Sequence, residues 1–524
     1  MPFSSRACQT CKLRRIKSQC KPQLTHPKCD ETKPACLRCT KSRRICLESS
    51  VIEQAGFSIN LENAYASGKL KRPRGPRSNL TLLRPRFDLE ARAIAYFLQH
   101  HVVALTDVPD VAQSLCGCIA TWQASGRDSV MVDLALSATS LAVFSRVHQD
   151  HQAAIEASSR YCRVLQMVQQ NIATVRPSLT LDDRDTIEAC LLTMFLMGRY
   201  EATMHNYSVL TPDNNSTASI HRQLHHDGAL TILKVWVDSR DPSPSPSPSP
   251  SPSVTTAKSI VKLGRRGLVQ SLLHKNLPLP EWLVDGARFG EHGLELDYDR
   301  IFVRVVKLHQ ASAALRQRGD ATTAVLLELL DEAQQLDNAL RDWATDLPDT
   351  WSYRRCTLSD PGPWPRKHFY SPTVYTFARP GYTSVWALYF TTRMLINSTR
   401  LKLLELCWRD PSLGPTYGQG QRLECSILLT SMADNLAFTL PFCFGKIKSK
   451  VSEDGSQALI AVGSDDEIKP YLAGLVVWEL AVASSLHGMD LKQRQWFRSE
   501  VAQLGRELGN GILESADTDE WPML

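Results

Sequence analysis

Cysteine residues recur at fixed spacings among basic side chains near the start of this chain. Cys8 and Cys11 are separated by two residues, and Cys36, Cys39 and Cys46 form a C-x2-C-x6-C pattern. Thiolate sulfur is a soft ligand that suits zinc, which takes four ligands in a tetrahedron. Six thiolates can therefore hold two zinc ions if two of the sulfur atoms bridge both metals. So short a segment has too little apolar material for a core, so metal binding would supply its folding free energy.

The first cysteine group departs from the second where its third cysteine should stand. Residues 18–28 intervene before Cys29, and removing these eleven residues restores C-x2-C-x6-C in both groups. Cys20 is then a seventh cysteine for six places. A ligand seven positions after Cys11 returns to nearly the same helix face, whereas Cys20, nine positions on, falls opposite. We therefore expect Cys29 to be the sixth ligand, with Cys20 as the alternative; a retained intron would also explain the insertion.

The cysteine pattern resembles the fungal zinc binuclear cluster family of transcription factors. That family's signature is C-x2-C-x6-C, a proline-containing loop and a second C-x2-C-x6-C, matched here by the cysteines above and by 29–34. The resemblance implies that Cys8 and Cys36 bridge two zinc ions. It also implies that the first helix enters the major groove of double-stranded DNA and reads CGG-type half-sites through Arg14 and Arg15. Lys17 matches the lysine that precedes the third ligand.

The side chains between the two cysteine groups have the chemistry that DNA recognition needs. Arginine pairs bidentately with guanine O6 and N7, and lysine neutralises phosphates. The expected DNA-binding residues are Lys12, Arg14, Arg15 and Lys17. The expected zinc ligands are Cys8, Cys11, Cys29, Cys36, Cys39 and Cys46.

Charge is distributed unevenly along the chain. Residues 1–86 carry 19 Lys and Arg against 5 Asp and Glu, whereas the rest of the chain carries 41 against 49, so the net charge of +6 conceals a basic start and an acidic body. This is the pattern of a nucleic-acid-binding module joined to a regulatory domain. A second basic run at 69–77 reads as a flexible arm on the DNA backbone, as a nuclear import signal, or as a solvated linker.

The remainder of the chain has helical patterning almost throughout, so the expected fold class is all-α. Helix-period spacing of apolar residues predicts a first helix that Asp88 caps and that runs through Leu98. Further helices are predicted at 130–147, 154–168, 186–200, 218–238, 257–274, 297–317, 321–343, 382–408, 419–440, 468–487 and 490–509. The expected parts are a zinc cluster of two short helices (1–50), a basic flexible linker (51–86), a helical regulatory domain (87–513) and an acidic tail (514–524). A disordered Ser-Pro repeat at 241–253 interrupts the helical domain. Segments 225–229 and 277–282 resemble, less specifically, the regulatory domain that follows the zinc cluster in many fungal factors.

Other classes of protein fit these patterns less well. A secreted disulfide framework fits poorly, because seven cysteines cannot all pair internally and no apolar signal stretch follows Met1. An enzyme would need the acid pair Asp182 and Asp183, or metal ligands at 225–227, but no catalytic motif surrounds them. No stretch of about twenty uncharged apolar residues is evident, so no membrane association is expected. A zinc-stapled protein-interaction module without DNA binding remains the alternative.

The sequence thus predicts a nuclear, zinc-dependent transcription regulator of RNA polymerase II genes that binds specific double-stranded DNA and is not an enzyme. By resemblance, such factors often control a metabolic or secondary-metabolite gene set. The mixed acidic and aromatic tail at 514–524 is typical of segments that recruit coactivators, and also of a frayed end. Residues 47–68 contain no sustained heptads, so binding as a monomer and as a homodimer through the body both stay open.

Overall fold

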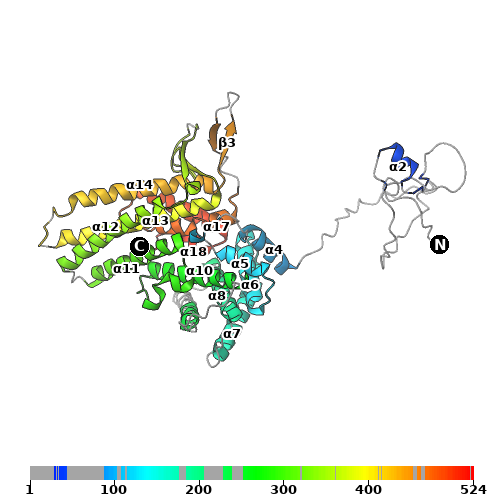
Figure 1. Ribbon diagram of the computed structural model, residues 1–524, viewed down its shortest axis with the longest axis horizontal. Helices are drawn as coiled ribbons and strands as arrows, with labels where there is room; N and C mark the ends of the chain where they lie inside the picture. Colours follow the sequence, from blue (N-terminus) through cyan, green and yellow to red (C-terminus); the bar gives the residue numbers. More distant parts are fainter. Residues whose placement is uncertain are drawn as a thin grey trace. The chain divides into compact units, whose positions relative to one another are not determined.

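Figure 1 shows a computed structural model of the chain. It describes residues 29–30, 32–33, 35–43, 46, 88–102, 108–112, 115–175, 184–205, 228–238, 252–318, 322–359, 362–410, 412–414, 416–451, 457–461, 467–519 and 521–524. The chain separates into two compact units, Met1–Arg84 and Pro85–Leu524. We call these the cysteine unit and the helical unit.

Helices account for most of the structure: 73% is helical and 4% is strand. The expectation of a mainly helical fold is therefore confirmed. The longer helices are α4 (Leu89–His101), α5 (Leu115–Ala124), α6 (Val130–His148), α7 (His151–Val175), α8 (Arg184–Met204), α10 (Pro252–Lys275), α11 (Gly293–Arg318), α12 (Thr323–Thr345), α13 (Pro380–Arg409), α14 (Gln419–Cys443) and α17 (Leu491–Leu508). Shorter ones are α15 (Pro470–Ala473), α16 (Val477–Ala483) and α18 (Gly511–Glu514), so the helix expected at 468–487 is broken in two.

Local signals explain where several helices begin and end. The Oγ of Ser129 accepts the amide hydrogen of Val132 at the start of α6, and Asp490 accepts that of Gln493 at the start of α17. The second helix ends at Gly509 with φ of 59°, a left-handed conformation that glycine adopts without steric cost. Asp88 stands at the N-cap of α4 as expected, but its side chain makes no capping hydrogen bond.

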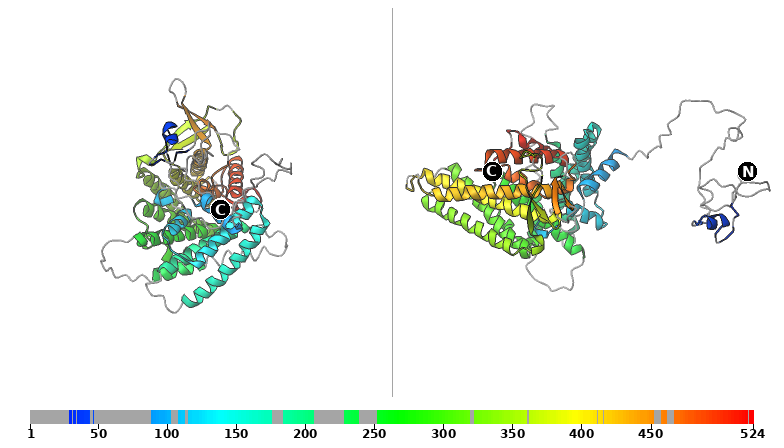
Figure 2. Two further views of the ribbon diagram at one scale, coloured as in Figure 1. Left: turned by 90° about the vertical axis from the view of Figure 1, so that its right-hand side faces the viewer. Right: turned by 90° about the horizontal axis from the view of Figure 1, so that it is seen from above.

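Long helices pack side by side around α13. Helices α11, α12, α14 and α16 each contact α13. Helix α11 also contacts α12. The right-hand view of Figure 2 shows these long helices lying side by side. Helix α13 is buried along most of its length, which explains why its sequence is apolar on every side rather than on one stripe. A neighbouring group is formed by α6 with α4, α7 and α8.

Buried charges within this core are paired. Asp337 of α12 is 3% exposed and accepts hydrogen bonds from Arg393 of α13, with Nε–Oδ1 and Nη2–Oδ2 distances of 2.9 and 2.7 Å. Asn397, one turn later on α13, donates to the same carboxylate at 3.1 Å. A buried ion pair is tolerated only when the groups are well matched in this way. The contact therefore fixes the register of α12 against α13.

Two β-hairpins were not expected from the sequence. Strand β1 (Tyr353–Thr357) pairs antiparallel with β2 (Thr373–Phe377), and β3 (Ile447–Val451) pairs antiparallel with β4 (Gln457–Ala461). The strands are only five residues long, so their alternation is too brief to stand out from the helical patterns around them. On the first hairpin, the rings of Tyr353 and Tyr375 stack with centroids 4.2 Å apart, which fixes its register.

Two helices, α6 and α14, are long and apolar enough to cross a membrane by length and composition alone. Within the helical unit, 72% and 56% of their apolar windows are buried. Core helices of folded domains meet the same criterion, so this is weak evidence for a membrane span. The expected absence of membrane association stays a prediction.

The end of the chain is packed against the helical unit. Trp521 is 7% exposed, and its Nε1 donates to the Ser484 Oγ at 3.0 Å. Glu514 accepts two hydrogen bonds from Arg146 of α6, at 2.8 and 2.7 Å. The segment expected as a free acidic tail or a frayed end thus contacts α6 and the end of α16. A coactivator role for it would require its release.

Several expected features fall outside the described residues. They include the insertion at 18–28, the linker at 51–86, and most of the Ser-Pro repeat. The last proline of that repeat, Pro252, is the first residue of α10. Proline is favoured there because the first helical amide needs no intrahelical partner.

Candidate metal centre

The cysteine unit holds a short helix that begins at one of the predicted ligands. Helix α2 (Leu37–Lys41) has Cys36 as its N-cap, and the Cys36 Sγ accepts the backbone hydrogen of Cys39 at 3.4 Å. The two-residue spacing thus places the Cys36 sulfur at the first turn of the helix, within hydrogen-bond distance of a backbone amide.

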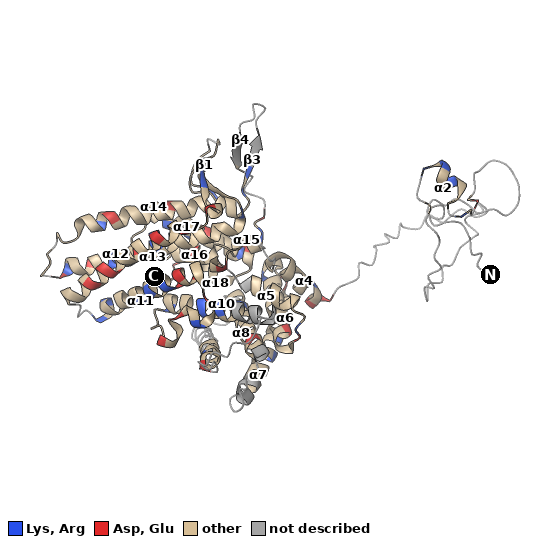
Figure 3. Ribbon diagram, viewed as in Figure 1, with Lys and Arg blue, Asp and Glu red and all other residues tan. Residues whose placement is uncertain are grey.

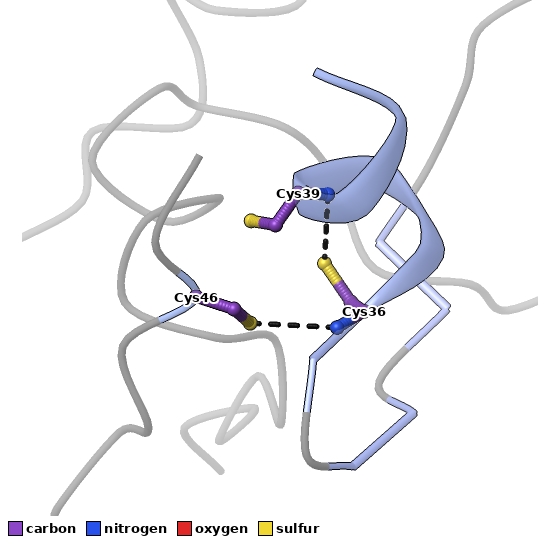
Figure 4. A group of neighbouring side chains, drawn as sticks. All are labelled: Cys36, Cys39 and Cys46. Carbon is purple, nitrogen blue, oxygen red and sulfur yellow. Dashed lines mark hydrogen bonds between the residues drawn. The ribbon is translucent and has the colours of Figure 1, made fainter. Parts of the chain in front are cut away.

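Three sulfur atoms converge beside this helix. The Sγ atoms of Cys36, Cys39 and Cys46 lie within 4.8 Å of one another. Figure 4 shows the three side chains turned toward a common point, with the amide of Cys36 donating to the Cys46 Sγ at 3.4 Å. The C-x2-C-x6-C spacing therefore does bring its three cysteines together, as expected for a shared metal.

A second ligand group contains Cys36 again. The Cys29 and Cys36 Sγ atoms and a carboxylate oxygen of Asp30 also lie within 4.8 Å of one another. In the described part of the chain, the Cys36 sulfur is therefore the one atom shared by the two groups of potential ligands that contain cysteine. The structure places Cys29 next to a predicted bridging ligand, whereas Cys20 lies outside the described residues.

The donor set fits a thiophilic metal ion. Cys29, Cys36 and Cys39 are 1%, 0% and 2% exposed, and none of these three nor Cys46 forms a disulfide bond with another described residue. A tetrahedral zinc site with Zn–S bonds of about 2.3 Å has its sulfur atoms about 3.8 Å apart. Such a separation lies within the 4.8 Å limit that both groups meet. Buried free thiols at this separation, with amide groups donating to sulfur, are suited to binding as thiolates. The cluster of four cysteines can hold a metal ion.

Asp30 is a supporting residue that sequence reasoning missed. Its Oδ1 accepts the backbone hydrogen of Leu37 at 2.9 Å, and its Oδ2 accepts the hydroxyl hydrogen of Thr32 at 2.5 Å. The hydroxyl of Thr32, together with backbone donors, lowers the pKa of this exposed carboxyl group. Asp30 thereby ties the Cys29 segment to the first turn of α2. The only sequence signal was an acidic residue next to thiols in a basic region.

Substitution of this residue tests the supporting role. We expect Asp30→Ala to weaken zinc binding by about tenfold or more, since outer-shell partners of metal ligands typically contribute that much. Asp30→Asn is the matched control, because it keeps an oxygen that can accept from Leu37. Competition with a chromogenic chelator would measure both affinities. Equal affinities for Asp30→Ala and the parent chain would show that Asp30 does not position the ligands.

Basic side chains lie on the surface of α2. Arg38 and Lys41 belong to this helix and Arg43 follows it, and no acidic residue lies in its first turn. Figure 3 shows this positive colouring on α2. The predicted ligands and DNA-binding residues nearer the start of the chain lie outside the described residues: Cys8, Cys11, Lys12, Arg14, Arg15 and Lys17.

Cysteines of the helical unit have a different environment. Cys118, Cys407, Cys425 and Cys443 are buried free thiols. Burial raises the pKa of Cys425 to about 11 and raises that of Cys443 further. A thiol that resists ionisation is a poor zinc ligand. Their surroundings agree with the expectation that they are packing residues.

The other candidate sites do not provide a comparable centre. The acid pair Asp182 and Asp183 and the segment 225–227 lie outside the described residues. Asp110, His292 and Glu295 form a further group of potential ligands. The Glu295 carboxylate is already held at 2.8 Å by both Lys262 and Arg266, and a divalent cation would have to displace them.

Comparison with known proteins finds no matching family model, no matching curated protein and no matching solved structure. Function is therefore inferred from the residues of this chain alone.

Proposed function

We propose that this protein is a zinc-dependent, sequence-specific DNA-binding transcription regulator. In this proposal, Cys8, Cys11, Cys29, Cys36, Cys39 and Cys46 hold two zinc ions. The observation that carries it is the position of Cys36, whose sulfur belongs to both described groups of potential ligands. Six thiolates can serve two tetrahedral ions only if two of them are shared.

Zinc would supply the folding free energy of the cysteine unit and would itself take no part in chemistry. The thiols hold the metals, the amides of Cys36 and Cys39 donate to sulfur, and Asp30 ties the two ligand groups together. A rigid cluster of this kind can hold a neighbouring basic helix in one orientation. Base reading requires such rigidity, because each side chain must meet a base edge with hydrogen-bond geometry.

DNA is the partner that the charge distribution favours. The excess of 14 positive charges in residues 1–86 provides phosphate contacts, and Arg14 and Arg15 provide the bidentate groups that read guanine in CGG-type half-sites. The basic run at 69–77 supports nuclear localisation. Control of a metabolic or secondary-metabolite gene set by RNA polymerase II belongs to the same proposal, as do recruitment of coactivators and a homodimeric state.

Arg14 is expected to contribute to sequence preference. Arg14→Ala should lower affinity for the selected duplex by about 1–3 kcal/mol and relax the preference at one guanine, because a bidentate base contact is lost. Lys12→Ala is the control: loss of a phosphate contact weakens all duplexes alike and reduces the salt dependence. Binding-site selection on both variants at fixed salt measures the difference. An unchanged preference for Arg14→Ala would remove this residue from base reading.

A further inference from the structure

A cavity of about 280 Å³ lies inside the helical unit. Its walls come from α10, α11, α13 and α16, which are neighbours in the packed core. Apolar side chains provide most of the lining, among them Leu263, Val269, Phe302 and Leu388. The volume is at the lower end of the range for small-molecule sites, which are concave and mostly apolar with a few polar groups.

One side of the cavity carries charges that cancel. Lys262, Arg265 and Arg266 of α10 face the carboxylates of Glu291, Glu295 and Asp299. Each cation lies within 3 Å of at least one of these acids, with Lys262 at 2.8 Å from Glu295 and Arg265 at 2.5 Å from Asp299. Of these six residues, only Arg266, Glu295 and Asp299 line the cavity. The three cations and three acids together carry no net charge.

Glu479 of α16 has no such partner. It lines the cavity, is 8% exposed, and forms no ion pair with any residue in the described part of the chain, although its own backbone amide donates a hydrogen bond to its carboxyl group. Burial raises its pKa to about 8. The groups that interact with it electrostatically, Tyr298 of α11 and Cys443 of α14, have pKa values raised by burial and bring no positive charge. A buried acid without a cation lowers stability, so its presence needs another reason.

A second polar group beside Glu479 also lacks a partner. The Nε1 of Trp478, which lines the same cavity, is buried and has no hydrogen-bond acceptor among the described residues. Indole nitrogen is a donor only, and it usually finds a partner when it is buried. An acid without a cation and an N–H donor without an acceptor, both at one cavity, are suited to a polar end of a bound molecule.

Gly267 is an exposed residue of α10 that also lines this cavity. A Cβ built on it would meet no atom within 4 Å. Glycine inside a helix costs stability relative to alanine, and packing does not require it here. A larger side chain at this position can therefore be introduced beside the cavity without a clash.

We propose that this cavity binds a small, largely apolar molecule with one cationic amino group, whose ammonium pairs with the Glu479 carboxylate. The carboxyl group of Glu479 is mostly protonated at pH 7 in the empty cavity. An ammonium ion favours the ionised carboxylate, so binding would release this proton to solvent. The apolar lining suits a ring system in the ligand. The Trp478 N–H can donate to an acceptor atom of the ligand, or the indole ring of Trp478 can face its cation. The site lies within the helical unit and does not depend on the proposed DNA binding.

Calorimetric titration of the full-length chain at pH 7 tests the proposal. The probes are tryptamine, the alcohol indole-3-ethanol and the carboxylate indole-3-propionate, which share a ring and differ in charge. We expect saturable binding of tryptamine, weaker binding of the alcohol and none of the carboxylate. Preference for the carboxylate, or no binding of any probe, would overturn the proposal.

Variants locate the binding to the cavity. Glu479→Gln should weaken tryptamine by about tenfold or more, because a charge-assisted contact is lost, while changing the alcohol little. Gly267→Leu should abolish binding of both by occupying the space, whereas Gly267→Ala and the exposed α12 variant Glu328→Gln should leave it unchanged. Equal tryptamine affinity in Glu479→Gln and the parent chain would refute the assigned pairing.

A stability measurement guards against a misfolded variant. The folded-state pKa of Glu479, about 8, lies above its ordinary value of 4.5, so the unfolded chain loses this proton first as the pH rises. The parent chain should therefore lose stability between these two pH values relative to Glu479→Gln, which should be at least as stable at pH 7. A Glu479→Gln chain that is folded yet less stable at pH 7 would show that the carboxyl group has a structural partner, against the proposal.

Discussion

Cys36→Ser is expected to remove both zinc ions and all sequence-specific DNA binding. The other ligands each belong to one group in the described part of the chain, whereas the Cys36 sulfur is shared and also caps α2. Its loss leaves neither ion with four sulfur ligands, and the sequence of residues 1–50 has too little apolar material for a core that would hold the segment without metal. Zinc content by mass spectrometry and binding to the selected duplex would measure the two losses.

Control exchanges separate this effect from general thiol loss. Cys162→Ser alters an exposed thiol of α7 and should keep two zinc ions, and Cys20→Ser should do the same if Cys29 is the sixth ligand. Cys29→Ser should lower the zinc content. Full zinc content in Cys36→Ser, or a loss in Cys20→Ser but not in Cys29→Ser, would contradict the ligand assignment.

The second large effect is expected in the core of the helical unit. Asp337→Ala should lower the free energy of unfolding by about 3–5 kcal/mol, because it leaves Arg393 buried and without its carboxylate. Arg393 is 7% exposed and also donates to the Tyr389 hydroxyl at 3.2 Å, which is a neutral partner and cannot replace the charge. Chemical denaturation followed by circular dichroism would measure the change.

Another acid on the same helix provides the comparison. Glu332 of α12 pairs with Arg304 at 2.8 Å, but these side chains are 31% and 45% exposed. Glu332→Ala should therefore cost about 1 kcal/mol or less. The double exchange Asp337→Leu with Arg393→Met should recover most of the lost stability, since apolar residues can replace a buried ion pair. Similar losses for Asp337→Ala and Glu332→Ala would show that burial does not decide the cost.

The helical class could be predicted because long segments carry strong periodic signals. Helices α6, α8, α12 and α14 lie close to their expected ranges, since apolar spacing over five or more turns cannot be mistaken for a strand. Capping residues that are visible in the sequence mark some helix starts, such as Ser129 before α6 and Asp490 before α17.

The features that were missed depend on tertiary contacts. The hairpins formed by β1 with β2 and by β3 with β4 are too short to show a period. Helix α5 was not expected, and the break between α15 and α16 was not visible in an apolar run. Trp521 looked like part of a solvent-exposed tail, because sequence alone does not show the Ser484 hydroxyl that accepts its hydrogen bond.

The candidate metal centre could likewise be predicted only in part. The spacing of Cys36, Cys39 and Cys46 predicted that their sulfur atoms meet, because a short helix fixes the first two. The part played by Asp30 could not be predicted, since it depends on a backbone amide seven residues away. The pairing state of Glu479 was also invisible, because burial and partners appear only when four helices have packed.

Zinc content and DNA preference of the full-length chain, measured together, test the central claim most directly. The chain would be purified with zinc, stripped with a chelator and reconstituted, and each sample would be offered a random pool of duplexes. The account predicts two zinc ions per chain and enrichment of duplexes with CGG-type half-sites, lost on stripping and regained with zinc. A chain that folds in the cysteine unit without metal, or that binds all duplexes equally when loaded with zinc, would contradict it.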